Sequence, residues 1–250
     1  MPVRSSRSAL TPITLLAQAR ADLAARRDPV RAESTRSYFK KSEPIVLFGL
    51  SVPDTRALAR GYVREVRGSW TVREATQFAT LAVAQRETET KFIGFFVLAG
   101  FQGDFPRTLA ATVRRWLAAG QCNNWALVDA LSSEVIAPLL DRHPGLLPAI
   151  TGWSVSKNLW LRRASIVPLA SLARRGRHLD EAYAVATALL GDDHDLIHKA
   201  TGWILREAGK TDTPRLVAYL RRFGRRMSRT TVRYAIERLP VAQRRRLLAE

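Results

Sequence analysis

NNWALVD, residues 123–129, is the stretch with which the repeated helix pairs of this chain can be aligned. Trp125 and Asp129 are four residues apart, which places the indole and the carboxylate on the same face of a predicted helix. When the second helix of each successive helix pair is aligned with this stretch, each pair has a charged residue at the same position. These residues are Lys91, Asp129, Arg163, Lys199 and Arg233. The intervals between them are 38, 34, 36 and 34 residues, which is the period of stacked helix pairs.

Helical periodicity dominates the chain, whereas strand-like alternation and hairpin turns are nearly absent. We predict one domain over residues 1–250, with N-terminal helices in 13–66, helix pairs in 70–238 and a C-terminal helix in 240–250. The helices expected within it are 13–26, 28–39, 53–66, 71–85, 88–99, 105–119, 124–140, 145–153, 157–173, 179–190, 193–207, 213–223 and 228–238, with a connecting loop at 42–52. The sequence therefore predicts an all-α solenoid of stacked helical repeats. In such a solenoid the second helices commonly line a concave face.

Composition narrows the class of partner. The net charge of +18, from 40 Lys and Arg against 22 Asp and Glu, indicates a polyanionic partner, with nucleic acid as the first candidate. A hydrophobic content of 46% excludes general disorder, and no run reaches the roughly 18 to 20 uncharged apolar residues of a membrane span. The single Cys122 permits no internal disulfide and indicates a reducing compartment. Residues 4–7 are rich in Arg and Ser and lack the apolar block of a secretory signal.

The aligned charges favour a binding surface. We expect Lys91, Arg163, Lys199 and Arg233 to face a basic groove, in which Asp129 is the one acid. The alternative is that these positions are simply the solvated edge of each helix, where charge is ordinary. Aromatic neighbours favour the groove: Trp125 lies one turn before Asp129, and Trp203 lies one turn after Lys199. Indoles beside basic side chains are suited to stacking on bases or holding a cation.

On these residues the chain resembles the DNA alkylation repair (AlkD-like) family of HEAT-like-repeat DNA glycosylases. The segments that resemble the family are YFKKSEP (38–44), VPDTR (52–56), NNWALVD (123–129), NLWLRRASI (158–166) and HKATGWILREAGKTD (198–212), of which the last is the most specific. The resemblance implies an all-α solenoid of HEAT-like repeats with a basic concave face that grips duplex DNA. It also implies that the excising carboxylate is Asp129 and that Trp125, Arg163 and Trp203 contact the lesion. The N-terminal region matches the family loosely, and its loop at 42–52 is apolar.

The residues themselves suit a site with one carboxylate. Breaking the bond between a base and its deoxyribose builds positive charge on the sugar, and a fixed carboxylate lowers the barrier to that step. An alkylated purine such as N3-methyladenine or N7-methylguanine is already cationic and leaves without protonation. We therefore expect a DNA-3-methyladenine/7-methylguanine glycosylase that needs no cofactor. Its expected partner is double-stranded DNA with alkylated bases, on which it acts as a cytoplasmic, nucleoid-associated monomer. Lys91, Lys199 and Arg233 are the expected phosphate contacts. The alternatives are a HEAT-like solenoid that binds duplex or branched DNA without chemistry, and a protein-binding scaffold.

Three other groups of residues are weaker candidates. His194 and His198 are four residues apart, as in a helical metal site, but no third ligand is evident, so a helix face is the better interpretation and no metal is expected. Cys122 has no adjacent base and is interpreted as a structural thiol. Glu207 and Asp212 could act on the lesion, but ion pairing with Arg206 and Lys210, or helix capping, is more ordinary.

Overall fold

The computed structural model describes residues 10–41, 43 and 45–249. Within these ranges there is no β-strand, and Val46 and Glu87 form an isolated bridge. The predicted all-α, helical-repeat fold is confirmed. The chain divides into two compact units: an N-terminal unit, residues up to 106 together with 121–130, and a C-terminal unit, residues 107–120 together with 131 onward. The Arg- and Ser-containing residues 4–7, as well as Ser42, Pro44 and Glu250, lie outside the described residues.

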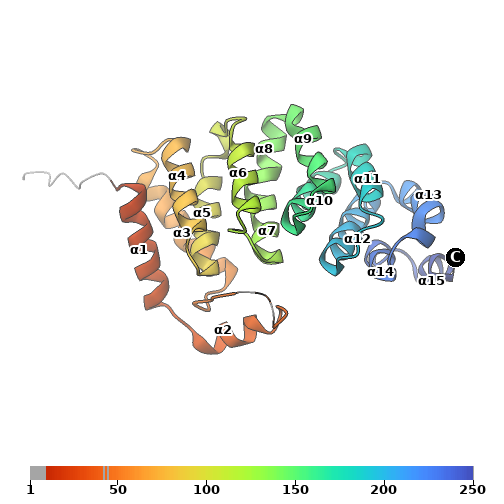
Figure 1. The fold of residues 1–250 in the computed structure, drawn as a ribbon, viewed down its shortest axis with the longest axis horizontal. Coiled ribbons are helices and arrows are strands. Elements are labelled where there is room, and N and C mark those ends of the chain that lie inside the picture. Colours follow the sequence, from red (N-terminus) through yellow and green to blue (C-terminus); the bar gives the residue numbers. More distant parts are fainter. Residues whose placement is uncertain (1–9, 42, 44, 250) are drawn as a thin grey trace, which may run out of the picture. The chain divides into compact units, whose positions relative to one another are not determined.

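The helices of the N-terminal unit begin where the sequence supplies capping groups. In order they are α1 (Pro12–Ala25), α2 (Pro29–Arg36), α3 (Val52–Val66), α4 (Val72–Val83), α5 (Thr88–Ala99), the 3₁₀ turn η1 (Gln102–Asp104) and all but the last residue of α7 (Trp125–Leu131). Thr71 and Glu74 form a capping box at the start of α4, and Asp28 caps α2. The helix α5 packs against both α3 and α4, and α4 packs against α1 (Figure 1). In α5 the residues from Thr88 to Leu98 are all buried, so this helix forms the centre of the N-terminal unit.

The loop between α2 and α3 is fastened to α5 by one carboxylate. Glu89 is 2% exposed and accepts hydrogen bonds from the N–H of Gly49 at 2.8 Å and of Phe48 at 3.1 Å. Gly49 has a φ of +96°, and a Cβ there would lie 2.0 Å from the carbonyl oxygen of Asp28. Only glycine tolerates both the positive φ and this close approach. In its described part, the apolar loop predicted at residues 42–52 is therefore an ordered segment that Glu89 holds against α5. We call this segment the strap.

Glu89→Gln is expected to lower the free energy of unfolding by about 1 to 3 kcal/mol, the usual cost of leaving a buried polar group unsatisfied. The amide can accept only one of the two N–H groups, and its own NH₂ faces the other. Urea unfolding followed by circular dichroism measures the change. Glu65→Gln is the matched control, because Glu65 is exposed on α3 of the same unit, and substitutions at exposed positions usually change stability by at most about 0.5 kcal/mol. An equal loss in both variants would contradict the role of Glu89.

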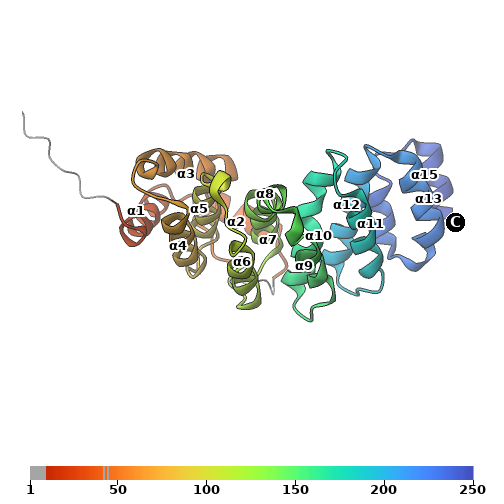
Figure 2. The same ribbon diagram turned by 90° about the horizontal axis from the view of Figure 1, so that it is seen from above.

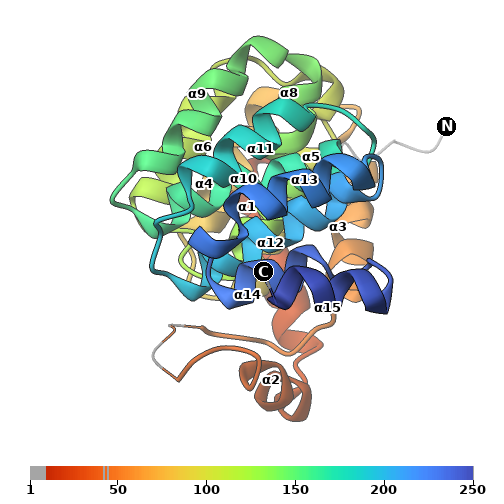
Figure 3. The same ribbon diagram turned by 90° about the vertical axis from the view of Figure 1, so that its right-hand side faces the viewer.

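The C-terminal unit continues the succession of paired helices. In order it contains α6 (Leu109–Ala118), the π-helical turn η2 (Ser132–Ile136), α8 (Ala137–Arg142), the 3₁₀ turn η3 (Pro144–Leu146), α9 (Leu147–Thr151), the 3₁₀ turn η4 (Gly152–Val155), α10 (Leu159–Ala173), α11 (Leu179–Ala188), α12 (Asp195–Gly209), α13 (Thr213–Phe223), the 3₁₀ turn η5 (Gly224–Arg226), α14 (Arg229–Ala235) and α15 (Val241–Ala249). The helix α12 packs between α10 and α14 (Figure 1). The helix α11 packs against α10 and α12 (Figure 2). The α12–α14 contact is very close, because a Cβ at Gly202 would lie 2.4 Å from the Cβ of Tyr234. Figure 3 shows α14 and α15 near the C-terminus.

The observed helices agree with the predicted ranges to within a few residues, with two corrections. Residues 124–140 were expected to form one α-helix, but they contain the π turn η2 between α7 and α8. Residues 145–153 were also expected to form one helix, but they consist of the short α9 between two 3₁₀ turns. None of the described helices has the length and apolar content that crossing a membrane requires.

Candidate functional site

Trp125 and Asp129 lie on α7 of the N-terminal unit, and both side chains are partly exposed. The start of the helix is fixed by Asn124, which is 1% exposed and whose Oδ1 accepts a hydrogen bond of 2.9 Å from the N–H of Leu127. The indole of Trp125 stacks on the ring of Phe39, with ring centroids 5.2 Å apart and planes 20° apart. Because its partner Phe39 is itself only 9% exposed, this stack anchors the indole one turn before the carboxylate.

Lys91 does not face an open surface. Its side chain is 7% exposed, and its Nζ donates a hydrogen bond of 2.6 Å to the carbonyl oxygen of Gln121. Burial lowers the pKa of the Lys91 ammonium, while Cys122 and Glu87 oppose that shift. The expectation that Lys91 lines a groove is wrong, because the α5 helix that bears it is covered on all sides. Instead, Lys91 holds the turn that leads into α7.

Cys122 lies in the same turn and is completely buried. Burial raises the pKa of its thiol to about 12, although the nearby Lys91 ammonium lowers it. At neutral pH the thiol is protonated and therefore a poor nucleophile. The interpretation of Cys122 as a structural thiol is confirmed.

In the C-terminal unit, Arg163 projects from α10 to the first turn of α12. It is 5% exposed, so the expectation of a groove-facing guanidinium is wrong here as well. Its Nη1 donates a hydrogen bond of 2.5 Å to the carbonyl oxygen of Leu196. The N–H of Leu196 in turn donates to Nδ1 of His194 at 3.1 Å. The position of Arg163 thus depends on how α12 begins.

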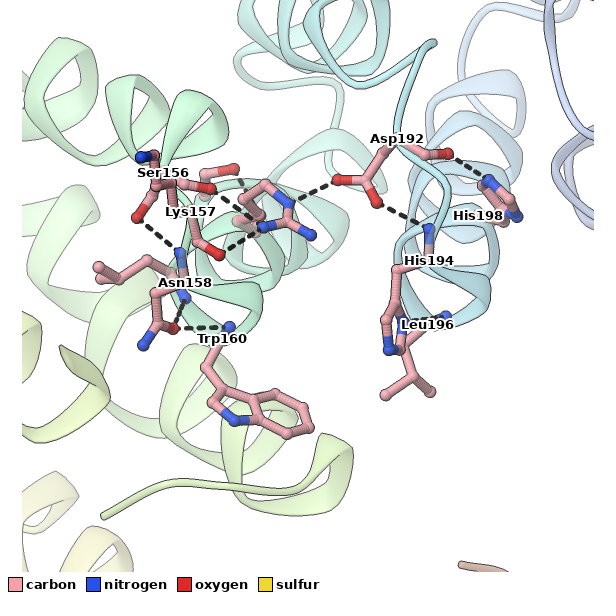
Figure 4. A network of polar contacts seen from close by, with 11 residues as sticks. Ser156, Lys157, Asn158, Trp160, Asp192, His194, Leu196 and His198 are labelled. Carbon is pink, nitrogen blue, oxygen red and sulfur yellow. Dashed lines mark hydrogen bonds and ion pairs between the residues drawn. The ribbon is translucent and has the colours of Figure 1, made fainter. Parts of the chain in front are cut away.

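The loop before α12 is held by the neighbouring Arg162 (Figure 4). Nε of Arg162 donates to Oδ2 of Asp192 at 2.5 Å, and its Nη1 donates to the carbonyl oxygens of Ser156 and Lys157, each at 3.0 Å. The other carboxylate oxygen of Asp192 accepts from the N–H of His194 at 2.9 Å. With 7% of its side chain exposed, Asp192 forms a nearly buried ion pair. Sequence reasoning did not single out Asp192.

The two histidines of this loop have structural partners. His194 is the N-cap of α12 and not part of its face, which corrects the expectation that both histidines share a helix face. Nε2 of His198 lies 2.5 Å from the carbonyl oxygen of Asp192. A carbonyl oxygen can only accept, so Nε2 of His198 bears the proton. In the described residues no group of three His, Cys, Asp or Glu side chains is arranged to hold a metal ion.

The remaining predicted residues are on helices of the C-terminal unit. Lys199 and Trp203 are one turn apart on α12, and both are partly exposed. The ammonium of Lys199 lies 2.9 Å from the carboxylate of Asp195, and this hydrogen bond raises the pKa of Lys199. Arg233 is exposed on α14. Lys199 and Arg233 are therefore accessible to an anionic ligand, in contrast to Lys91.

Glu207 forms ion pairs and Asp212 caps a helix, which are the roles that the sequence favoured. Glu207 is 4% exposed, and its carboxylate lies 2.6 Å from Nζ of Lys210 and 3.4 Å from Nε of Arg206. Asp212 caps α13 by accepting a hydrogen bond from the N–H of Arg215 at 3.0 Å. Both interpretations are confirmed.

His194→Ala is expected to lower the free energy of unfolding by about 0.5 to 2 kcal/mol, because the first turn of α12 loses its side-chain acceptor. His194→Asn should restore most of this loss, since Asn is among the best N-cap residues. Urea unfolding of the wild type and both variants measures the two changes. If the Asn variant were as unstable as the Ala variant, capping would not be the contribution of His194.

Comparisons with known proteins agree with the fold and with the family. A predicted DNA alkylation repair enzyme from Enterococcus faecalis is similar in structure, with a TM-score of 0.75 and 19% identity over 86% of this chain and 97% of that one. AlkD2 from Streptococcus mutans has a TM-score of 0.63 and 15% identity, over 92% of this chain and 100% of that one. No curated protein sequence matches. The model of the family described as "DNA alkylation repair enzyme" matches residues 19–239. This chain therefore belongs to the DNA alkylation repair enzyme family.

Proposed function

We propose that this protein is a DNA glycosylase that excises cationic alkylated purines, such as N3-methyladenine and N7-methylguanine, from duplex DNA. Its membership of the family supports a role in DNA alkylation repair. The assignment of glycosylase activity depends on the geometry of α7. There the partly exposed carboxylate of Asp129 lies one turn after the indole of Trp125, which is anchored by stacking on Phe39. A catalytic group works best from a rigid element whose neighbours fix it.

Asp129 is the proposed catalytic group. As the bond between the base and its sugar breaks, positive charge grows on deoxyribose, and a carboxylate stabilises that charge more strongly in the transition state than in the ground state. The bonding electrons pass to the alkylated purine, which leaves as a neutral base and needs no proton, while water adds to the sugar carbon and releases its proton to solvent. Trp125 offers an aromatic face to the cationic purine. Its stacking on Phe39 reduces the entropy that it loses when the lesion binds.

Residues of the C-terminal unit are proposed to bind the rest of the substrate. Following the family pattern, Trp203 contacts the lesion. Arg163, whose side chain is buried, is proposed to act indirectly by holding the carbonyl of Leu196 in the first turn of α12. Lys199 and Arg233 contact phosphates. Lys91, which was expected among the phosphate contacts, is proposed to act indirectly by fixing the carbonyl of Gln121 before α7.

The direct test is to incubate the purified protein with duplex DNA methylated by an alkylating agent and to identify the released bases by chromatography. Release of N3-methyladenine or N7-methylguanine above the spontaneous rate supports the proposal. If the protein binds the methylated duplex tightly but releases no base, it binds DNA without chemistry, and the glycosylase assignment fails.

The double variant Lys199→Ala/Arg233→Ala is expected to weaken binding to any duplex. It should also reduce the slope of log K against log salt concentration by about two units, since each phosphate contact contributes about 0.9 to that slope. The slope is measured as log K against log salt concentration by fluorescence anisotropy. Arg175→Ala/Arg177→Ala is the matched control, because it removes the same charge from residues paired with Asp141. An unchanged slope in the first variant would show that Lys199 and Arg233 are ordinary solvated side chains.

A further inference from the structure

The last helices of the C-terminal unit form a groove of ≈ 680 Å³. We call it the C-terminal groove. Its apolar floor consists of Leu220, Val232, Leu247 and Leu248. The first three of these side chains are at most 8% exposed, whereas Leu248 is 37% exposed. The floor is therefore a well-packed surface with one leucine that solvent can reach.

Arginine surrounds this floor. Arg221, Arg225 and Arg229 line the groove from α13, the η5 turn and α14. Within the described part of the chain, no acidic side chain forms an ion pair with Arg225 or Arg229. Residues 213–249 contain eleven arginines and a single acid, Glu237, and that acid is already paired with Arg206 and Arg238. Among the described residues, no acidic side chain therefore compensates the positive charges of Arg225 and Arg229.

This combination fits an acidic peptide better than nucleic acid. Single-stranded nucleic acid is held by stacking its bases on aromatic side chains, and no aromatic residue lines the groove. A duplex presents phosphates on its outside, which suit arginine but leave an apolar floor uncovered. A flexible peptide with several carboxylates followed by a large apolar side chain satisfies both parts, because guanidinium groups form charge-assisted pairs with carboxylates and the apolar side chain covers the floor.

We propose that the C-terminal groove is a docking site for a short acidic segment of a partner protein that ends in an apolar residue. The carboxylates pair with Arg225 and Arg229, and the apolar residue packs on Leu248. None of the residues that line this groove is among those proposed for base excision. The proposal therefore stands or falls independently of the glycosylase assignment.

The experiment uses the full chain and a fluorescein-labelled peptide of four aspartates followed by Leu-Phe, with binding followed by fluorescence anisotropy. Two control peptides replace either the aspartates by asparagines or the Leu-Phe by Gly-Gly. Each control is expected to bind at least about tenfold more weakly, since it loses either the charge or the apolar contact. Because these controls change only the ligand, they do not depend on any variant of the protein folding.

Variants then locate the site. Arg225→Glu/Arg229→Glu is expected to weaken peptide binding at least about tenfold, and Leu248→Asn about fivefold. Arg114→Glu/Arg174→Glu makes the same change of charge at exposed residues elsewhere in the C-terminal unit and should leave binding within about twofold. Equal weakening by both double variants, or equal binding of the Gly-Gly peptide, would reduce the effect to general electrostatics and overturn the proposal. It would also be overturned if Arg225→Glu/Arg229→Glu weakened binding to duplex DNA as much as binding to the peptide.

Discussion

Asp129→Asn is expected to lower the rate of base excision by at least about tenfold to a hundredfold and to leave DNA affinity unchanged or slightly tighter. Asparagine keeps the size and shape of the side chain but removes the negative charge that stabilises the developing sugar cation. Removing that charge also removes its repulsion of the phosphates, so binding does not suffer. Single-turnover release of methylated purines measures the first effect, and fluorescence anisotropy measures the second.

Asp180→Asn is the matched control for this substitution. Asp180 is 88% exposed on α11, where it pairs with Arg215, and its loss removes the same charge. Its excision rate should equal that of the wild type. If Asp129→Asn also retained near-normal excision, the catalytic assignment of Asp129 would be wrong, and α7 would have only a structural role.

The second large effect concerns the leaving group. N3-methyladenine and N7-methylguanine should be released while uracil and 8-oxoguanine stay in place, with a discrimination of several kcal/mol, since each tenfold in rate is about 1.4 kcal/mol. A neutral base departs as an anion unless a general acid protonates it. Glu207, one turn after Trp203 on α12, is the nearest acid along that helix, but Lys210 and Arg206 pair with its carboxylate. Each of its two carboxylate oxygens therefore lies beside a cation.

This discrimination is measured by single-turnover release from duplexes with one defined lesion, after subtraction of the rate without protein. Cationic purines also leave spontaneously, so the Asp129→Asn protein serves as a second baseline. Comparable release of uracil and a methylated purine would show that Glu207 or another group acts as a general acid. The mechanism with one carboxylate would then have to be abandoned.

Helix positions were predictable because the residues that begin helices are local. Thr71 with Glu74, Asp28 with Pro29, and Asn158 each mark a helix start through hydrogen bonds within three residues. The π turn at Ser132–Ile136 was not predicted, because no local group of residues marks it in the sequence. One extra residue in a helical turn changes the backbone hydrogen bonds but leaves an apolar pattern that a period of 3.6 still fits approximately.

The site was predictable as a set of helix faces but not as a set of accessible side chains. Periodicity places Lys91 and Lys199 at equivalent positions, yet the first is buried and the second is partly exposed. The difference lies in the helix around each residue, because the FIGFFVLA sequence that follows Lys91 is apolar on every side. A helix of that kind is usually covered on all faces, so the burial of Lys91 could have been inferred. Phe39 and Asp192 act through contacts with residues far along the chain, which no local pattern reveals.

The strap between α2 and α3 also takes part in the local unfolding of the N-terminal unit. The amide protons of Phe48 and Gly49 lie in a loop but are bonded to a buried carboxylate forty residues away, so they exchange with solvent only when Glu89 releases them. The same loop follows Phe39, whose ring supports the indole of Trp125. Hydrogen exchange at these two amides therefore reports a local unfolding event that also disturbs the indole next to Asp129.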